Sequence, residues 1–219
     1  MSNSCVIVGA GPGIGRALAM AFAREGLDVA LIARAPEKLI TITTEVAWKT
    51  GRQVRAYGAD AGESASLLAA LSAAQNELAT PKVLIYNAAM VRRTRPLSLS
   101  LDQLMSELRV NVGGALTAAQ AVAPVMRAGG GGCILFTGGG VADAPSATYA
   151  SLSMGKAALK NLTQTLAQEL GEHGIHVATV TVHGFVQAGT RFDPATIAQQ
   201  FVELYRQPSG SFELERIYK

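Results

Sequence analysis

Short runs of aliphatic residues alternate along this chain with longer stretches in which apolar side chains recur at helical spacing. The first run covers residues 5–8 and ends at a glycine, and the stretch after it places Ile14, Leu18, Ala21 and Phe22 at helical spacing. The same pattern predicts strands at residues 5–8, 29–32, 53–57, 83–86, 133–136, 176–182 and 212–218, and helices at residues 14–25, 36–49, 64–78, 100–127, 146–170 and 194–205. Near-continuous apolar strands that alternate with helices are typical of a parallel sheet covered on both faces.

The alternation runs through the whole chain. No linker, repeat or low-complexity segment interrupts it, and the four glycines at 129–132 are typical of a turn between a helix and a strand. A chain of 219 residues is long enough for one large domain. We therefore expect residues 1–219 to form one α/β domain, a doubly wound parallel sheet of about seven strands.

Composition and charge exclude several classes of protein. Hydrophobic residues make up 49% of the chain and charged residues 16%, which excludes a disordered chain. The net charge is only +3, and the cluster of Arg92, Arg93 and Arg95 has no interleaved aromatic residue, so no nucleic-acid partner is expected.

Cys5 and Cys133 lie in apolar runs and are expected to be reduced core residues. The sequence shows neither a signal-peptide pattern nor an apolar stretch of membrane-spanning length, so we expect a cytoplasmic protein without a membrane partner.

A glycine-rich turn joins the first predicted strand to the first predicted helix. It carries Gly9, Gly11, Gly13 and Gly15, with Ile14 between the last two. Glycines let the backbone turn sharply and let a pyrophosphate approach without Cβ clashes, and a helix N-terminus offers free N–H groups to phosphates. Because the glycines lie in the required strand–turn–helix context, they predict a dinucleotide site, with a plain glycine turn as the alternative.

The spacing of Gly9, Gly13 and Gly15 is Gly-x-x-x-Gly-x-Gly, and together with later segments it resembles the short-chain dehydrogenase/reductase family from Val6 to about Thr190. The resemblance implies a Rossmann fold and hydride transfer between a nicotinamide cofactor and a small carbonyl or alcohol substrate. It also implies a homodimer or homotetramer built through the two long helices, which carry apolar residues on more than one face.

The end of the second predicted strand bears on which cofactor is bound. NAD enzymes place an acid there for the ribose 2′-hydroxyl, whereas this chain has Ala33 followed by Arg34, with Arg16 just inside the first helix. Two guanidinium groups and no carboxylate suit a 2′-phosphate, so the sequence favours NADP(H) over NAD(H). The alternative is that Arg16 and Arg34 are ordinary solvated charges.

Further cofactor residues come from the resemblance alone. Asp60, with Ala61 beside it, matches the family's adenine-contacting aspartate, and Asn87 and Ala88 match part of its Asn-Asn-Ala-Gly segment. That segment begins here with Tyr86, so the match is partial. After the sixth strand, the residues Gly184, Val186 and Thr190 match the segment that holds the nicotinamide, and residues 183–211 form the expected substrate loop region.

The catalytic segment departs from the family pattern. The family uses Tyr-x-x-x-Lys, a serine about a dozen residues before the tyrosine, and a helical asparagine; a lysine beside the phenol moves its pKa toward working pH. Here Lys156 matches the catalytic and cofactor-binding lysine and Asn111 the asparagine, but Leu152 stands four residues before Lys156. The nearest tyrosine is Tyr149, two helical turns or about 10 Å from Lys156 along a helix axis. Thr137, twelve residues before Tyr149, is the hydroxyl that keeps roughly the family's spacing.

Two functions therefore stay open. In the first, the chain is an NADP(H)-dependent oxidoreductase that uses Tyr149, Lys156, Asn111 and Thr137. In the second, it is a catalytically weak dinucleotide-binding member of the family that acts as a sensor or partner-binding subunit. The sequence favours the first, because the cofactor framework is nearly complete.

Two further features lie near the expected substrate end. His183 replaces a proline of the family; it is either a proton carrier or a structural histidine, and the second is favoured because no acidic partner is apparent in the sequence. Arg92, Arg93 and Arg95 either attract an anionic substrate or belong to a solvated loop, which is the commoner case. No metal site is expected, because no cluster with metal-ligand spacing is present.

Overall fold

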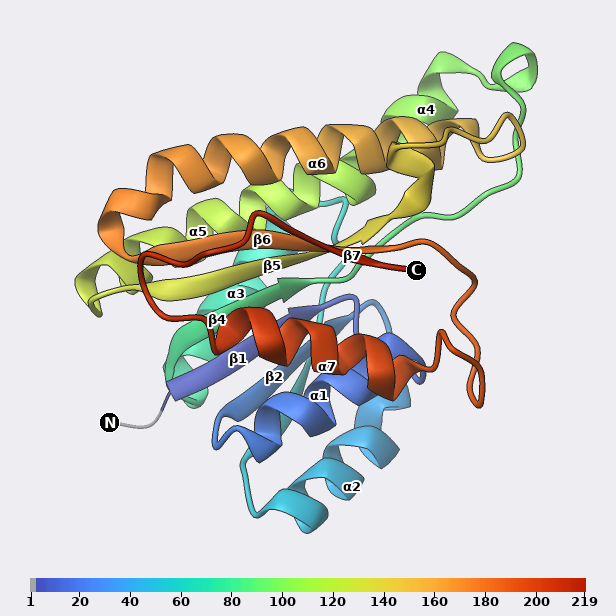
Figure 1. Cartoon of the computed structure of the whole chain (residues 1–219). Coiled ribbons are helices and arrows are strands. Elements are labelled where there is room, and N and C mark those ends of the chain that lie inside the picture. Colours follow the sequence, from blue (N-terminus) through green and yellow to red (C-terminus); the bar gives the residue numbers. More distant parts are fainter. Residues whose placement is uncertain (1–2) are drawn as a thin grey trace.

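A seven-stranded parallel sheet forms the centre of the computed structural model, which describes residues 3–219 (Figure 1). The spatial order of the strands is β3-β2-β1-β4-β5-β6-β7, and every neighbouring pair is parallel. The strands are β1 (Asn3–Val8), β2 (Asp28–Ala33), β3 (Val54–Gly58), β4 (Thr80–Tyr86), β5 (Gly132–Gly139), β6 (Ile175–Val182) and β7 (Glu215–Tyr218). The doubly wound parallel sheet expected from the sequence is confirmed, and its strand order reverses between β1 and β4, where such sheets open a ligand crevice.

Helices cover both faces of the sheet (Figure 1). One face carries α1 (Ile14–Arg24), α2 (Ile40–Thr50) and α7 (Pro194–Tyr205), and the other carries α3 (Ser64–Glu77), α4 (Leu101–Leu108), α5 (Gly114–Ala128) and α6 (Ala150–Leu170). Short 3-10 turns are η1 (Pro36–Leu39), η2 (Pro96–Ser98), η4 (Gly140–Ala142) and η5 (Gly171–His173), and η3 (Arg109–Gly113) is a π-helical turn.

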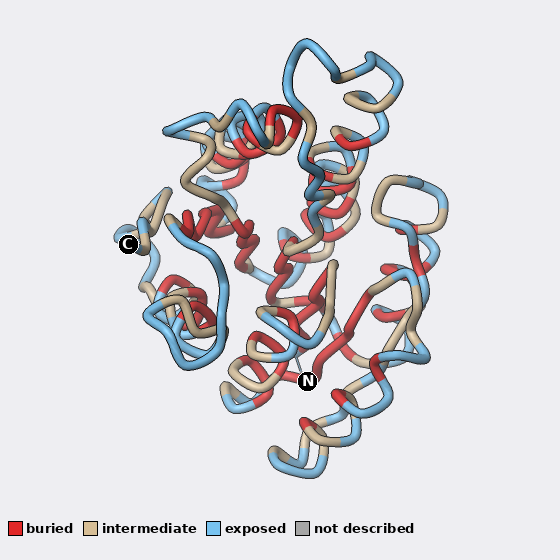
Figure 2. Tube along the Cα trace, turned by 90° about the vertical axis from the view of Figure 1, so that its right-hand side faces the viewer, coloured by how far each residue is buried: buried red, intermediate tan, exposed pale blue. Residues whose placement is uncertain are grey.

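Side chains of successive strand residues enter two cores, one on each side of the sheet. Cys5, Ile7 and Leu31 pack under α1 and α7, whereas Val6 and Val8 pack under α3 and α5. This division explains why the strands are apolar at nearly every position, because both faces of each strand are buried. Figure 2 views the molecule from the carboxyl edge of the sheet, where buried residues run through the middle and the surrounding loops are exposed. Cys5 and Cys133 are buried free thiols, as expected.

Two helices differ from the sequence prediction. The helix predicted over 100–127 is interrupted by the π turn η3 before α5 begins. A hydrogen-bonded π turn contains one residue more than an α-helical turn. The helix predicted from 146 begins at Ala150, because the preceding residues pair with another segment. The amide of Thr94 donates to the carbonyl oxygen of Thr148 at 3.0 Å, and the amide of Ala150 donates to that of Thr94 at 3.3 Å.

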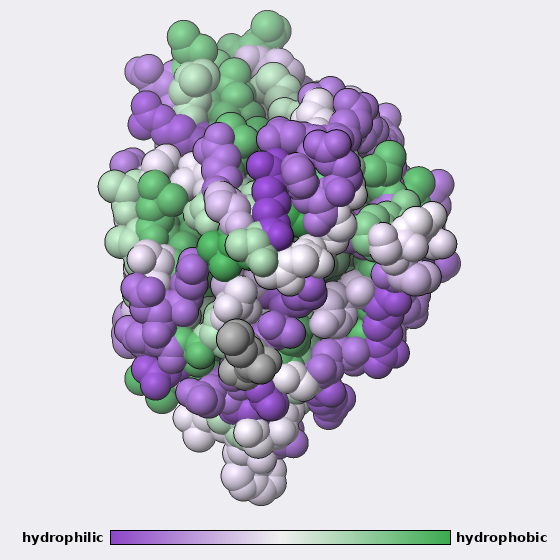
Figure 3. Space-filling model, turned by 90° about the vertical axis from the view of Figure 1, so that its left-hand side faces the viewer, coloured by the Kyte–Doolittle hydropathy of each residue, from purple (hydrophilic) through white to green (hydrophobic). Residues whose placement is uncertain are grey.

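The amino edge of the sheet lies on the opposite side of the molecule. Figure 3 shows this face, on which hydrophilic and hydrophobic side chains are intermixed. Within residues 3–219, no helix combines the length and the apolar character needed to cross a lipid bilayer.

Candidate active site

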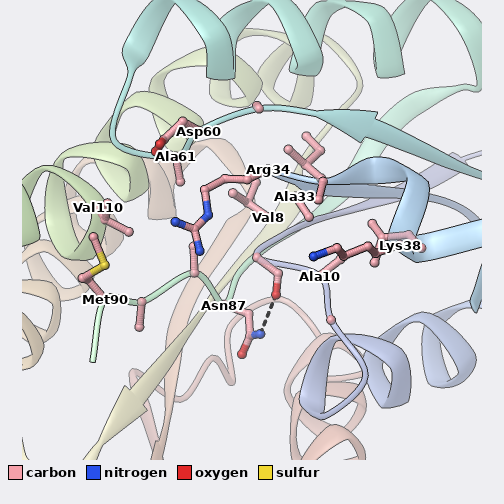
Figure 4. Close-up of a pocket in the computed structure, with 18 of the residues that line it drawn as sticks. Val8, Ala10, Ala33, Arg34, Lys38, Asp60, Ala61, Asn87, Met90 and Val110 are labelled. Atoms are coloured by element: carbon pink, nitrogen blue, oxygen red, sulfur yellow. Dashed lines mark hydrogen bonds between the residues drawn. The ribbon is translucent and has the colours of Figure 1, made fainter. Parts of the chain in front are cut away.

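A cleft of about 470 Å³ opens at the carboxyl ends of β1, β2 and β4. Its walls come from the glycine turn after β1, the segment after β2, Asp60 and Ala61 after β3, and Asn87 to Met90 after β4 (Figure 4). The cleft lies at the point where the strand order reverses. The structure therefore brings together segments from four strand ends that the sequence analysis assigned to one nucleotide site.

The glycines of the turn after β1 divide into two kinds. Gly9 has φ +87°, and a Cβ there would lie 2.3 Å from the backbone nitrogen of Ala88; a Cβ at Gly15 would lie 2.8 Å from the Cα of Ala10. These two positions need glycine for the fold itself. A Cβ on Gly11 or Gly13, in contrast, would meet no atom within 4 Å.

The start of α1 supplies what a phosphate needs. In this described helix no side chain caps the N-terminus and no acidic residue lies in the first turn, so the first amides and the positive end of the helix dipole are available. Ile14 is the first helical residue, and it packs against the core below the turn. Open space over Gly11 and Gly13 beside free amides fits the pyrophosphate of a dinucleotide.

This division predicts opposite effects for two substitutions. Gly11→Val should leave the fold intact and lower NADPH affinity at least about 100-fold, because its side chain fills the space over the turn. Gly9→Ala should instead destabilise the protein by about 3 kcal/mol, because its Cβ overlaps backbone atoms. Urea unfolding and calorimetric NADPH titration of both variants measure the two effects. Wild-type NADPH affinity in Gly11→Val would show that the phosphates do not lie over this turn.

Two cations enter the cleft from the segment after β2. Arg34 and Lys38 are exposed residues of the cleft lining, and both side chains extend into it (Figure 4). Among residues 3–219, no ion pair joins either of them to a carboxylate. Lys38 was missed by the sequence analysis, although its place four residues after Arg34, at the start of the next predicted helix, was a usable signal.

Arg16 is turned away from these two cations. Its Nε and Nη2 donate to the two carboxylate oxygens of Glu45 on α2 at 2.8 and 2.5 Å, and it is not among the residues that line the cleft. The side-chain hydrogen bonds from Arg16 and Lys49 lower the pKa of Glu45 to about 2. The structural case for a 2′-phosphate therefore depends on Arg34 and Lys38.

A chain of hydrogen bonds links four of the expected site residues. The side-chain amide of Asn87 donates to the carbonyl oxygen of Gly9 at 2.9 Å, and the hydroxyl of Thr137 donates to Oδ1 of Asn87 at 2.8 Å. Nζ of Lys156 donates to the carbonyl oxygen of Thr137 at 2.6 Å. Burial lowers the pKa of Lys156 to about 8, so that ammonium and neutral amine are both populated near neutral pH. The Thr137 hydroxyl, however, is already donated to Asn87.

Asn111 lies in the π turn η3 and faces the segment after β4. Its Oδ1 accepts from the amide of Met90 at 2.6 Å, and its Nδ2 donates to the carbonyl oxygen of Met90 at 3.3 Å. On its other side, α6 comes so close that a Cβ on Gly155 would lie 2.9 Å from the Cβ of Asn111. The structure thus places Asn111 against the residue directly before Lys156.

Tyr149 precedes α6 and points to a different partner. Its hydroxyl accepts a hydrogen bond from Nε of Arg93 at 3.0 Å, and the Arg93 guanidinium carbon lies 5.7 Å from the centre of its ring. The structure therefore pairs Tyr149 with the arginine cluster after β4, and it shows no hydrogen bond between Tyr149 and Lys156, both of which are described residues. A catalytic role for Tyr149 stays a prediction.

The positions where the family pattern calls for tyrosine and serine hold residues without hydroxyls. Leu152 lies on α6, one turn before Lys156. Gly139 ends β5, thirteen residues before Leu152, and a Cβ there would lie 3.7 Å from Cγ of Lys156, which is an ordinary contact. A side chain at position 139 would therefore fit beside Lys156, but the chain has none.

The expected substrate region, 183–211, starts at the end of β6. A Cβ on Gly184 would overlap the ring of Phe192, Val186 is exposed, and Thr190 donates its hydroxyl to the carbonyl oxygen of Gln187 at 2.8 Å.

His183 packs against Gly140, and its Nε2 lies 3.4 Å from Oδ2 of Asp143. This acidic partner could not be found from the sequence, because Asp143 follows a different strand. Within residues 3–219, no group of three or more His, Cys, Asp or Glu side chains is arranged to hold a metal.

Comparison with known proteins identifies the family of this chain. The family model for the short chain dehydrogenases matches residues 3–193. This chain belongs to the short-chain dehydrogenase family. Members of the family are oxidoreductases that act on CH–OH and C=O groups, and this chain is an oxidoreductase of that class.

Individual short-chain dehydrogenases show how far the similarity extends. The short-chain reductase protein NovJ of Streptomyces niveus is 35% identical over 183 residues, which cover 83% of this chain and 68% of NovJ. Two crystal structures match 99% of this chain at 26% identity. One is a short-chain dehydrogenase from Rhodopseudomonas palustris, matched over 98% of its length with a TM-score of 0.90. The other is a metagenomic short-chain oxidoreductase in complex with NADP, matched over 96% with a TM-score of 0.89.

Proposed function

We propose that this short-chain dehydrogenase uses NADP(H) to transfer hydride between the nicotinamide and a small carbonyl or alcohol substrate. The observation that carries the proposal is the pair of cations, Arg34 and Lys38, that extend into the cleft beyond the end of β2. A 2′-phosphate is a suitable partner for a guanidinium and an ammonium at this position, where NAD enzymes place a carboxylate. The metagenomic relative solved with NADP supports the same choice.

Different residues of the chain would bind different parts of the dinucleotide. The open glycine turn and the start of α1 would hold the pyrophosphate, Arg34 and Lys38 the 2′-phosphate, and Asp60 with Ala61 the adenine side. Asn87 and Lys156 would hold the nicotinamide end, since the bond from Lys156 to Thr137 and the bond from Thr137 to Asn87 fix both side chains at the ends of β4 and β5. Bound NADPH supplies the hydride.

A second function is favoured by the residues at 139 and 152. Because Gly139 and Leu152 carry no hydroxyl, the proton donor of the family pattern is missing, and a dinucleotide-binding protein with weak catalysis fits this observation. Both functions require the same NADP(H) site. They differ in whether another group beside Lys156 can donate a proton.

Assembly into a homodimer or homotetramer remains part of the proposal. Leu116 on α5 and Met154 on α6 are large apolar side chains that the single chain leaves exposed. Both lie on the helix pair through which the sequence analysis expected subunits to meet.

Calorimetry on the whole chain tests the NADP(H) site directly. We expect NADPH to bind at least about tenfold more tightly than NADH, a difference of about 1.4 kcal/mol, because the 2′-phosphate adds charge-assisted hydrogen bonds. Equal affinities would contradict the assignment of Arg34 and Lys38 to the 2′-phosphate. Absence of heat with both coenzymes would overturn the proposed function as a whole.

A further inference from the structure

A histidine and an aspartate meet at the carboxyl edge of the sheet, next to the position where the family's serine is missing. His183 follows β6 and Asp143 follows the short turn η4 after β5, and their side chains approach to 3.4 Å between Nε2 and Oδ2. The His183 side chain is 24% exposed and the Asp143 side chain 36%, so both can be reached from solvent. Nε2 itself is sealed from solvent and makes no hydrogen bond within residues 3–219, and Oδ2 of Asp143 lies within ion-pair distance of it.

Asp143 is held in place as a charged group. Nζ of Lys160 on α6 lies 2.7 Å from Oδ1 of Asp143 and 2.9 Å from Oε2 of Glu215 on β7. The hydrogen bond from Lys160 is the main reason why the pKa of Asp143 lies below its usual range. The oxygen of Asp143 that Lys160 does not bind is the one that faces His183.

The ring of His183 can lie here because residue 140 is a glycine. A Cβ on Gly140 would lie 2.7 Å from Nδ1 of His183, so any larger residue would displace the imidazole. In the sheet, Gly139 is paired with Val182, and the stem of Lys156 lies beside Gly139. The Lys156 side chain therefore lies beside Gly139 and the imidazole beside the adjacent Gly140, where β5 ends.

The geometry points to His183, oriented by Asp143, as the group that donates a proton to the substrate oxygen in place of the missing phenol. This inference rests on the proposed function. In the reductive direction the carbonyl carbon receives the hydride with its electron pair, and the carbonyl oxygen receives the proton from Nδ1 of the imidazolium, the ring nitrogen that does not face Asp143. His183 is left neutral and takes a proton back from solvent, while Asp143 keeps its charge throughout.

The charged groups around the imidazole set the expected pH dependence. Asp143 faces the ring from the loop after β5, Lys160 and Glu215 lie behind Asp143 on α6 and β7, and Lys156 lies across Gly139. Because the donor must be protonated, reduction should be present at low pH and should be lost as the pH rises. Removing the charge of Asp143 should weaken reduction, because an opposite charge favours the protonated ring that donates the proton.

Nuclear magnetic resonance tests the pairing without any substrate. The chain has only three histidines, so their imidazole signals can be assigned by single substitutions. Asp143→Asn should shift the imidazole signals of His183, because the group that faces Nε2 loses its charge. Glu215→Gln is the matched control, because it removes the other carboxylate bound to Lys160 and should leave the His183 signals in place. Unchanged His183 signals in Asp143→Asn would overturn the pairing.

Kinetics of the full chain with NADPH test the catalytic role. The substrates are a short aliphatic aldehyde, an aromatic aldehyde, an α-diketone and a quinone. We expect His183→Gln to lower kcat/KM about 100-fold and to abolish the falling limb of the pH profile, with NADPH affinity within about twofold of wild type. His173→Gln, in an exposed turn at the other edge of the sheet, should change neither.

Failure of this inference can be told apart from failure of the proposed function. If NADPH binds and is oxidised, but His183→Gln keeps the wild-type rate and pH profile, His183 is not the donor. If NADPH binds and none of the four carbonyls is reduced, the donor role is likewise wrong and the weakly catalytic function is favoured. If NADPH does not bind, the proposed function itself fails.

Discussion

Arg34→Asp is expected to reverse the coenzyme preference. The guanidinium that extends into the cleft would be replaced by a carboxylate, which repels the 2′-phosphate of NADPH and can accept hydrogen bonds from the ribose 2′-hydroxyl of NADH. Loss of a charge-assisted hydrogen bond together with repulsion should weaken NADPH binding about 100-fold, or about 2.8 kcal/mol. NADH affinity should stay the same or rise. Calorimetric titration with both coenzymes measures the change.

A control separates this effect from a general change in charge. Arg95→Asp alters the net charge equally at an exposed residue that does not line the cleft, and it should change NADPH affinity less than about threefold. Lys38→Gln should give an intermediate loss, because Arg34 remains. If Arg34→Asp weakened NADPH and NADH equally, the side chain would serve the fold or the adenosine and not the 2′-phosphate.

The double substitution Gly139→Ser/Leu152→Tyr is expected to raise kcat/KM for carbonyl reduction at least about 100-fold. A tyrosine at position 152 would stand four residues before Lys156 on α6, a rise of about 6 Å. The nearby ammonium would favour the phenolate and bring the phenol toward its working pH. The serine has room, because the nearest atom to a Cβ at position 139 is Cγ of Lys156 at 3.7 Å.

The matched control for this gain is Gly139→Ser/Leu152→Phe. It fills the same space but has no phenolic hydroxyl, so it should stay at the wild-type rate. Steady-state oxidation of NADPH with the same carbonyls provides the measurement, and urea unfolding checks that both double variants are folded. If the variant with Leu152→Tyr binds NADPH and is no faster than the control with Leu152→Phe, the carbonyl does not react beside Lys156.

Most of the fold could be predicted from the sequence, because its signals are local and strong. The strands are apolar at almost every position because both faces are buried, and this pattern located every strand of the sheet. The helix ends were harder to predict. Apolar spacing continues across the π turn at Asn111, so the pattern did not show the break between α4 and α5.

The nucleotide half of the site was also visible in the sequence. Glycine spacing after β1 and Arg34 after β2 are features of single segments, and the cleft brings them together as expected. Contacts between distant segments were not visible. The bidentate bond of Arg16 to Glu45 and the bond of Tyr149 to Arg93 join residues 29 and 56 positions apart, and neither leaves a trace in local spacing.

By itself, the sequence determined the parallel sheet, the glycine turn and the absence of a tyrosine at 152, because each depends on residue type and on spacing within one segment. Only the tertiary structure decided which cations enter the cleft, which partner Tyr149 takes and that His183 faces Asp143. These arrangements depend on how strands and helices far apart in the chain pack against one another, and a carboxylate oxygen 3.4 Å from an imidazole nitrogen is a property of that packing alone.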